Sequence, residues 1–480
     1  MARFDMRSYF QALPLVTVLL AGCVNLAPPH QRGPLPVSAT YADVPATEAE
    51  NPAMEICWRD YFADGRLRQL LAQALATNRD VKVALLRVEE ARATYGIQRA
   101  DRLPTLAAGV DMARSRVPGD LSVSGQPVVG GQYQVGVGFT SWEVDFWGRV
   151  RSLETAALEN YLATEAAHRA AVLSLVTQVA NGYLGLGELD ERLALARRSA
   201  SSRAETLRIF RRRVELGATS KLELTQVEVL WQQASTLVAQ LEQARAAQSQ
   251  ALALLVGQEA GSLRTADRLD GLAVFRELQP GLPSELLISR PDIVAAEHAL
   301  KAANANIGAA RAAFFPRIAL TASAGTASAE LDGLFQGGSR AWTLAPSVSL
   351  PIFDSGRREA ALEVTRLRRE QALARYQQAI QAAFRDVSDA LSARHWLDEQ
   401  VHTLSASQAV QSERARLAKL RYDSGAARYL EVLDAERELL VVEQQLVQTR
   451  RALLSAQVAL YAALGGGSQA GGNAAEGCAE

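Results

Sequence analysis

The stretch LRYDSGAARYLEVLDAE, residues 420–436, places a glycine inside a segment that otherwise has the composition of one long helix. A related stretch, RRVELGATSKLELTQVE, lies 208 positions earlier at residues 212–228. Glycine readily adopts the left-handed backbone conformation that ends a helix. The two stretches therefore predict two long helical hairpins, with turns at Gly217 and Gly425.

The repeat extends far beyond the two turns. Residues 78–106 align with residues 290–318, and further matches continue as far as Gly257 and Gly465. A repeat of this length indicates one structural unit that occurs twice in the chain. We expect six segments: a signal peptide at 1–22, an extended tether at 23–65, a first repeat at 66–257, an equatorial linker at 258–289, a second repeat at 290–467 and a flexible tail at 468–480.

The N-terminus has the pattern of a bacterial lipoprotein signal. Arg3 and Arg7 precede an apolar stretch, residues 9–20, which is too short to span a membrane permanently. The stretch ends in Leu-Ala-Gly-Cys at residues 20–23, where cleavage before Cys23 would let its thiol carry a lipid. By resemblance to lipoprotein sorting rules, the following Val24 favours release to the outer membrane. An ordinary signal peptide that happens to contain a cysteine is the alternative. Either Met1 or Met6 is compatible with this signal.

Composition excludes several classes of function. A formal charge of −1 gives no reason to expect nucleic acid as a partner. The five histidines show no metal-ligand spacing, and the chain contains no P-loop and no nucleophile elbow, so we expect no catalytic residue, no metal and no cofactor besides the lipid. The two remaining cysteines, Cys57 and Cys478, could pair in an oxidising compartment or be unrelated thiols.

Each repeat contains a pair of alternating strands before its long helix. The pairs are expected at 103–146 and 315–353, with loops near 114–130 and 329–340. Their alternation suits strands with one face to lipid and the other to a lumen, although any half-buried sheet also alternates. Four strands cannot close a barrel, and an open sheet edge cannot lie in lipid. Three copies sharing one barrel would supply twelve strands.

The helices after the strand pairs are long and patterned in heptads. No proline interrupts residues 128–279, and about 68 helical residues would extend roughly 100 Å. In the last helix two adjacent apolar lines recur every seven residues, starting at Val432 and Leu433. Two lines indicate a neighbour on each side, as in the wall of a tube, whereas an ordinary long-helix bundle is the alternative.

Four motifs resemble the outer membrane factor family, the TolC/OprM-like channels, and within it the lipoprotein branch of multidrug efflux. They are WRDYFADGRLRQLLAQALATNRDVKVALLRVEEARA (58–93), ISRPDIVAAEHALKAANANIGAARAAFFPRIALTASAG (288–325), SVSLPIFDSGRREA (347–360) and LYAALGGG (460–467). The resemblance implies a mainly α chain with a membrane β-barrel. In a homotrimer of such chains, four strands per protomer form a 12-stranded barrel above a long α-helical tunnel and a mixed equatorial belt.

The resemblance also implies functional residues at the hairpin tips. The expected contacts to a periplasmic adaptor protein are Leu216, Gly217, Ala218, Ser424, Gly425 and Ala426. The expected periplasmic gate residues are Glu431, Asp434, Glu223, Tyr422 and Arg428. Rings of carboxylates around a narrow pore favour cations, but acids in the first turn of a helix also simply complement its dipole.

Two departures from the family pattern concern this gate. The first repeat has Gln226 where the second has Asp434, and Ala427 stands where some family members have a latch arginine. Arg428 is one position late, which puts the latch in doubt.

The resemblance predicts the function and location of the protein. We expect a passive exit duct for drugs or other small toxic solutes, located in the outer membrane with its tunnel in the periplasm. It would contact outer membrane lipid and be docked to an adaptor and a proton-driven inner-membrane pump. A type I protein-secretion duct and a structural coiled-coil envelope lipoprotein are the alternatives.

Overall fold

The computed structural model describes residues 26–29, 31–41, 52–259, 278, 281 and 283–468. The predicted signal peptide, Cys23, most of the predicted linker and nearly all of the predicted tail lie outside these residues. The chain divides into two compact units. Unit 1 comprises residues up to 33, 88–164 and 296–376, and unit 2 comprises 34–87, 165–295 and the residues from 377 onward.

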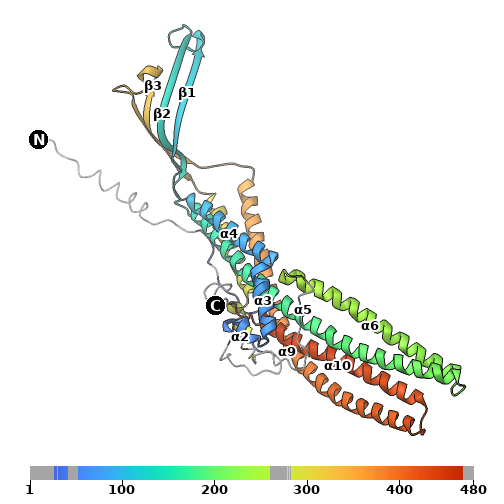
Figure 1. Cartoon of the computed structure of the whole chain (residues 1–480). Helices are drawn as coiled ribbons and strands as arrows, with labels where there is room; N and C mark the ends of the chain where they lie inside the picture. The colour runs from blue at the N-terminus through green and yellow to red at the C-terminus, as the bar shows by residue number, and fades with distance from the viewer. Residues whose placement is uncertain are drawn as a thin grey trace. The chain divides into compact units, whose positions relative to one another are not determined.

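Unit 1 contains one antiparallel sheet in the order β1-β2-β3-β4 (Figure 1). Its strands are β1 (Ala107–Val117), β2 (Val128–Glu143), β3 (Arg317–Ser328) and β4 (Arg340–Ser349). The two hairpins occur within the two expected strand pairs, and the β2–β3 pairing joins the first repeat to the second. The strands extend slightly into the expected loop at 114–130, because β1 continues to Val117 and β2 begins at Val128.

The sheet exposes a band of large apolar side chains. Val110 and Met112 on β1 are 77% and 72% exposed, and Trp342 and Val348 on β4 are 77% and 69% exposed. The close approach of β2 and β3 requires a glycine at position 325, because a Cβ there would lie 2.1 Å from the Val135 carbonyl oxygen. A soluble protein rarely leaves such a band open, so this surface is one that lipid or another chain covers.

The N-terminal segment of unit 1 docks on helix α8 (Pro291–Ala312). Arg32 makes two hydrogen bonds to Glu297, of 3.0 and 2.7 Å, and Arg311 donates to the Leu26 carbonyl at 3.0 Å. Burial would raise the pKa of Glu297, but Arg32 and Lys301 lower it to about 2. The segment after the predicted lipid attachment point is thus held against α8 at Leu26 and Arg32.

Four long helices run into unit 2: α5 (Arg149–Glu215), α6 (Lys221–Val256), α9 (Arg357–Asp423) and α10 (Tyr429–Ala463). Helices α5 and α9 each have 67 residues, which corresponds to about 100 Å. The carboxylate of Asp145 accepts from the backbone N–H groups of Val150 and Arg151 and so begins α5. The predicted heptad lines on α10 include the buried residues Val432, Leu433, Leu446, Val447, Leu460 and Tyr461.

Short helices complete unit 2 around an aromatic core. These are α2 (Trp58–Tyr61), α3 (Gly65–Thr77), α7 (Leu286–Ser289) and the 3-10 turns Ala53–Glu55 and Pro283–Glu285; α4 (Arg79–Ala100) begins in unit 2 and continues into unit 1. The rings of Tyr61 and Tyr461 stack at 4.2 Å, and the Tyr461 hydroxyl donates to the Ile56 carbonyl at 2.8 Å. Cys57 is disulfide-bonded, to a partner that lies outside the described residues.

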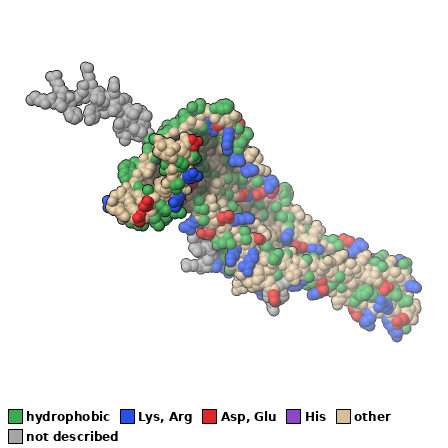
Figure 2. Space-filling view, turned by 90° about the horizontal axis from the view of Figure 1, so that it is seen from above, with side chains coloured by type: hydrophobic (Ala, Val, Ile, Leu, Met, Phe, Trp, Pro, Cys, Tyr) green, Lys and Arg blue, Asp and Glu red, His purple; other side chains and the backbone are tan. Residues whose placement is uncertain are grey.

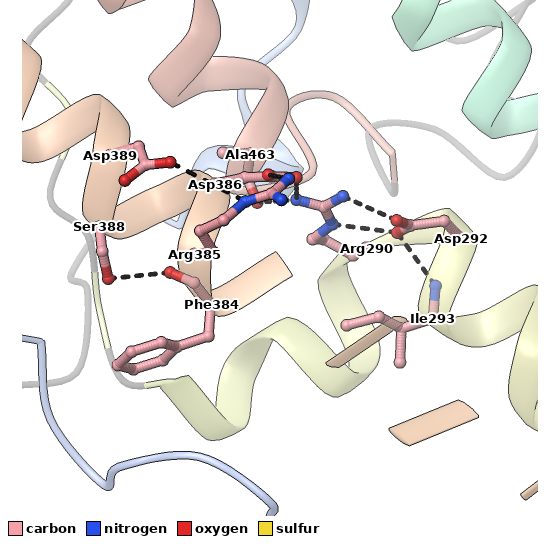
Figure 3. A network of polar contacts seen from close by, with 9 residues as sticks. All are labelled: Arg290, Asp292, Ile293, Phe384, Arg385, Asp386, Ser388, Asp389 and Ala463. Atoms are coloured by element: carbon pink, nitrogen blue, oxygen red, sulfur yellow. Dashed lines mark hydrogen bonds and ion pairs between the residues drawn. The ribbon is translucent and has the colours of Figure 1, made fainter. Parts of the chain in front are cut away.

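An equivalent hydrogen bond from a side chain to a backbone carbonyl occurs once in each repeat. In the first, the Asn78 amide donates to the Leu255 carbonyl of α6 at 3.1 Å. In the second, the aligned residue Arg290 donates to the Ala463 carbonyl of α10 at 3.3 Å, while also binding Asp292 and Asp386 (Figure 3). In each repeat, one polar side chain therefore joins the start of the segment that carries the strands to the end of the return helix.

Candidate functional site

The two hairpin turns have the same backbone geometry. Gly217 and Gly425 have φ angles of +70° and +74°, in the left-handed region. The N–H of Ala218 donates to the Arg213 carbonyl and that of Ala426 to the Arg421 carbonyl, both at 2.8 Å, which is a Schellman-type helix end. The predicted adaptor-contact residues all lie at these turns and are all exposed: Leu216, Gly217, Ala218, Ser424, Gly425 and Ala426. Charged side chains gather at this end of the molecule (Figure 2).

The two carboxylates of the second tip are paired with arginines of the same hairpin. Glu431 lies 3.0 Å from a guanidinium nitrogen of Arg421. Asp434 lies 2.7 Å from Arg414 and 2.8 Å from Arg437. The pairs with Arg421 and Arg414 link α9 to α10, and all three arginines partly neutralise the charge of the two carboxylates.

Glu223 of the first tip has the geometry of a helix cap. The Ser220 hydroxyl accepts from the Glu223 N–H at 3.2 Å, and the Glu223 carboxylate accepts from the Thr219 hydroxyl. This arrangement favours the helix-dipole interpretation for Glu223. Arg428 occupies the N-cap position of α10, and its side chain makes no capping hydrogen bond.

Tyr422 joins the second tip to the first. Its hydroxyl accepts from Arg213, whose guanidinium lies 5.8 Å from the Tyr422 ring centre and 5.6 Å from that of Phe210. Tyr422 also meets the ring of Tyr429 edge-on at 4.8 Å. Arg213 thus connects the two hairpins of one chain at the level of the tips.

An apolar core lies directly behind this aromatic cluster. Leu207 and Phe210 of α5, Val227 of α6 and Leu433 of α10 form one buried cluster. The hydroxyl groups of Thr206 and Tyr429 are 3.0 Å apart, and the rings of Phe210 and Tyr429 are 4.9 Å apart. Sequence reasoning missed this cluster, because an aromatic residue next to a turn has no distinctive pattern.

Charged groups are buried along the same contact. Burial raises the pKa of Glu436 on α10, an effect that the charges of Arg203 and Lys419 partly offset. Burial lowers the pKa of Arg203, which donates to the Leu230 carbonyl at 2.9 Å. The carboxyl group of Glu436 is therefore more readily protonated in the folded chain than in water.

A groove remains open on the second hairpin between α9 and α10. Its volume is about 1060 Å³. It is lined by Ala409, Val410, Glu413, Arg414, Leu417, Ala418, Arg421, Leu430, Glu431 and Asp434. Val410 and Leu417 are 68% and 47% exposed there. No group of residues with metal-ligating character was found in the described part of the chain.

Comparison with known proteins identifies the family. The family model for outer membrane efflux proteins matches residues 70–258 and 282–466, which is most of the chain. The chain belongs to this family. It is 41% identical to the outer membrane protein OprJ of Pseudomonas aeruginosa, over 95% of this chain and 96% of that protein. It is 40% identical to the solvent efflux pump outer membrane protein SrpC of Pseudomonas putida, over 95% and 98% of the two chains.

Solved channels have the same fold. The open state of the Neisseria gonorrhoeae MtrE outer membrane channel superposes with a TM-score of 0.84 at 39% identity, covering 93% of this chain and 99% of that one. A membrane protein from Pseudomonas aeruginosa superposes with a TM-score of 0.87 at 40% identity, covering 93% and 98%.

These comparisons test several predictions. The predicted fold class, mainly α with membrane strands and a helical tunnel, is confirmed. So are the function, an outer membrane efflux channel, and the location in the outer membrane with a periplasmic tunnel. The roles of the gate and tip residues remain predictions.

Proposed function

We propose that three copies of this chain form a passive efflux duct with one shared twelve-stranded barrel. The observation that carries the proposal is the four-stranded sheet, whose outer strands β1 and β4 have no further partner within the described chain. Unpaired backbone groups are too costly to leave in lipid, so copies must close the sheet on one another. The mass of the complex extracted in mild detergent tests this, and a stable monomer would contradict it.

The proposed cargo is a range of small toxic solutes. It is supported by relatives whose names describe solvent, toluene and antibiotic efflux pumps. The duct itself is not an enzyme, so the energy comes from a proton-driven inner-membrane pump joined through a periplasmic adaptor. Deleting the gene should sensitise cells to toluene and to hydrophobic antibiotics. Loss of a secreted protein without such sensitisation would favour a secretion duct, and absence of conductance in planar bilayers would favour a structural lipoprotein.

The lipid anchor is proposed at Cys23. Its support in the structure is the contact of Leu26 and Arg32 with α8, which begins three residues after Cys23. Labelled palmitate should be incorporated by the natural protein and not by a Cys23→Ser variant. Equal labelling of both proteins would exclude Cys23 as the acylation site.

The gate is proposed to include Glu431, Asp434 and Tyr422, held closed by the contacts of the tips. The double variant Glu431→Ala, Asp434→Ala removes the carboxylates that pair α9 with α10, and should increase the leak conductance of the reconstituted channel. Glu223→Ala is the matched control, because Glu223 lies in a helix cap and should change conductance little. If the double variant kept an unchanged closed state and an unchanged cation block, both acids would only complement the helix dipole.

The exposed turns are the proposed docking points for the adaptor. Replacing Gly425 with Val puts a β-branched residue at a φ of +74° and should distort the turn. Capture of the adaptor by the reconstituted channel should fall, while Ser412→Ala, at an exposed position of α9 outside the turn, should bind as the natural protein does. Undiminished capture by the Gly425 variant would place adaptor docking elsewhere.

A further inference from the structure

One face of the sheet in unit 1 is apolar, and the other is polar or carries small residues. Val137 on β2 pairs with Ala324 on β3, which in turn pairs with Trp342 on β4. On the opposite face, Asp111 on β1 pairs with Gln134 on β2. Because residues that pair across strands lie on the same side of a sheet, the apolar face can be followed over all four strands. In a membrane barrel the apolar face meets lipid and the polar face lines the lumen.

Three arginines lie on this apolar face. In steps of two residues, β1 places on it Ala108, Val110, Met112, Arg114 and Arg116. In the same way, β4 places on it Arg340, Trp342, Leu344, Pro346 and Val348. Every other side chain on this face of the four strands is uncharged. The three arginines are exposed, and within the described residues none of them has a hydrogen bond or an ion pair.

All three arginines lie at the hairpin ends of their strands. Strand β1 ends at Val117, just before the loop to β2, and β4 begins at Arg340, just after the loop from β3. The helices are joined to the other ends, since α4 precedes β1 and α5 follows β2. Because the helical tunnel is periplasmic, the hairpin ends face the outside of the cell.

Strand tilt brings Arg340 to the level of Arg114. Through Thr326 and Val135, Arg340 is in register with Val110, and Arg114 lies four residues further along β1. Four residues of a strand correspond to about 14 Å. Strands tilted by roughly 35–45° are offset by about 10–14 Å over three spacings of about 4.8 Å. Arg114, Arg116 and Arg340 therefore form one rim, just outside the apolar band, which we name the arginine rim.

We propose that the arginine rim binds the phosphate groups of lipopolysaccharide, the phosphorylated glycolipid of the outer leaflet. A guanidinium group can donate two parallel hydrogen bonds to one phosphate, and its charge complements that of the phosphate. An arginine on the lipid face is costly at the centre of the bilayer but is tolerated near its surface, where the lipid phosphates lie. The rim therefore has both the chemistry and the depth that this lipid requires.

The site is divided between two copies in the proposed shared barrel, on which this inference rests. Strands β1 and β4 are the outer strands of the sheet, so closing the barrel places β4 of one copy beside β1 of the next. Arg340 of the partner subunit then lies next to Arg114 and Arg116. One lipopolysaccharide molecule at each joint contacts both copies.

Binding of fluorescently labelled lipopolysaccharide to the channel, purified in mild detergent and freed of lipid, tests the site. A triple variant with Arg114→Gln, Arg116→Gln and Arg340→Gln should bind about tenfold more weakly or worse, because charge-assisted contacts are lost. The matched control removes three exposed arginines of α4 by Arg87→Gln, Arg92→Gln and Arg99→Gln, and should bind as the natural protein does. Dephosphorylated lipopolysaccharide and phosphatidylglycerol should both compete poorly with the labelled lipid.

Four results would overturn the proposal. The first is equal binding by the triple variant and the natural protein, and the second is equal loss of binding in the α4 control. The third is equally strong competition by dephosphorylated lipopolysaccharide or by phosphatidylglycerol, which would show that the rim does not select this glycolipid. Unchanged binding by the single variant Arg340→Gln would contradict a site shared by two copies.

Thermal stability provides a second measurement that also checks folding. Lipopolysaccharide should raise the Tm of the natural protein and of the α4 control, and should leave that of the triple variant unchanged. A triple variant with Arg→Lys at the same positions keeps the charges without the forked geometry, and should give an intermediate shift. An equal shift in all four proteins would contradict the assignment. A monomeric preparation would contradict the proposed function, while the effect of the three substitutions on binding still decides the lipid site.

Discussion

Replacing Arg290 should destabilise the fold far more than replacing Arg385, although both arginines bind Asp386 (Figure 3). The Arg290 side chain is only 12% exposed and also binds Asp292 and the Ala463 carbonyl, whereas that of Arg385 is 69% exposed. Removing one partner of a fully buried pair costs about 3–5 kcal/mol, because the remaining charge and carbonyl lose their partner. The Asp292 and Asp386 side chains are 41% and 35% exposed, so we expect a loss at the lower end of this range, about 3 kcal/mol. An exposed pair contributes about 0–1 kcal/mol.

Thermal unfolding of the detergent-solubilised channel measures this difference. At roughly 2–4 °C per kcal/mol, Arg290→Ala should lower the Tm by on the order of 10 °C. Arg385→Ala should lower it by at most about 2–4 °C. Arg290→Lys keeps the charge but not the two parallel bonds to Asp292, and should fall between them. Equal Tm values for the Arg290→Ala and Arg385→Ala variants would refute the reasoning from burial.

Two further predictions concern the docked N-terminal segment and the half-buried Glu436 on α10. A Cβ at Gly308 would lie 2.8 Å from the Ala27 nitrogen, so Gly308→Ala should cost about 1–3 kcal/mol and expose residues 26–32 to proteolysis. Gly96→Ala, at the aligned open position, should leave the digestion pattern unchanged. Because burial raises the folded-state pKa of Glu436, its ionised form destabilises the fold above that pKa, and stability is regained as the pH falls towards 4.5. Glu436→Gln should therefore raise the Tm at neutral pH and flatten its pH dependence; an unchanged profile would contradict the effect.

The hairpins and strands were predictable because each has a local physical cause. A glycine that must adopt positive φ marks each turn, and alternation marks the second strand of each pair. Since the chain is duplicated, every such signal occurs twice, which separates it from chance. The gate residues were predicted only from their match to family positions, and the arginines that pair with them were not predictable from the sequence.

Amino-acid order by itself therefore determined the elements of this protein: the repeat, the two turns at Gly217 and Gly425, and the membrane strands. Only the tertiary structure decided which faces meet. Arg421 pairs with Glu431, Arg213 contacts Tyr422, and α5 packs against both α6 and α10. The physical reason is that helix ends and strand alternation depend on neighbours in sequence, whereas ion pairs and contacts between helices join residues that only folding brings together.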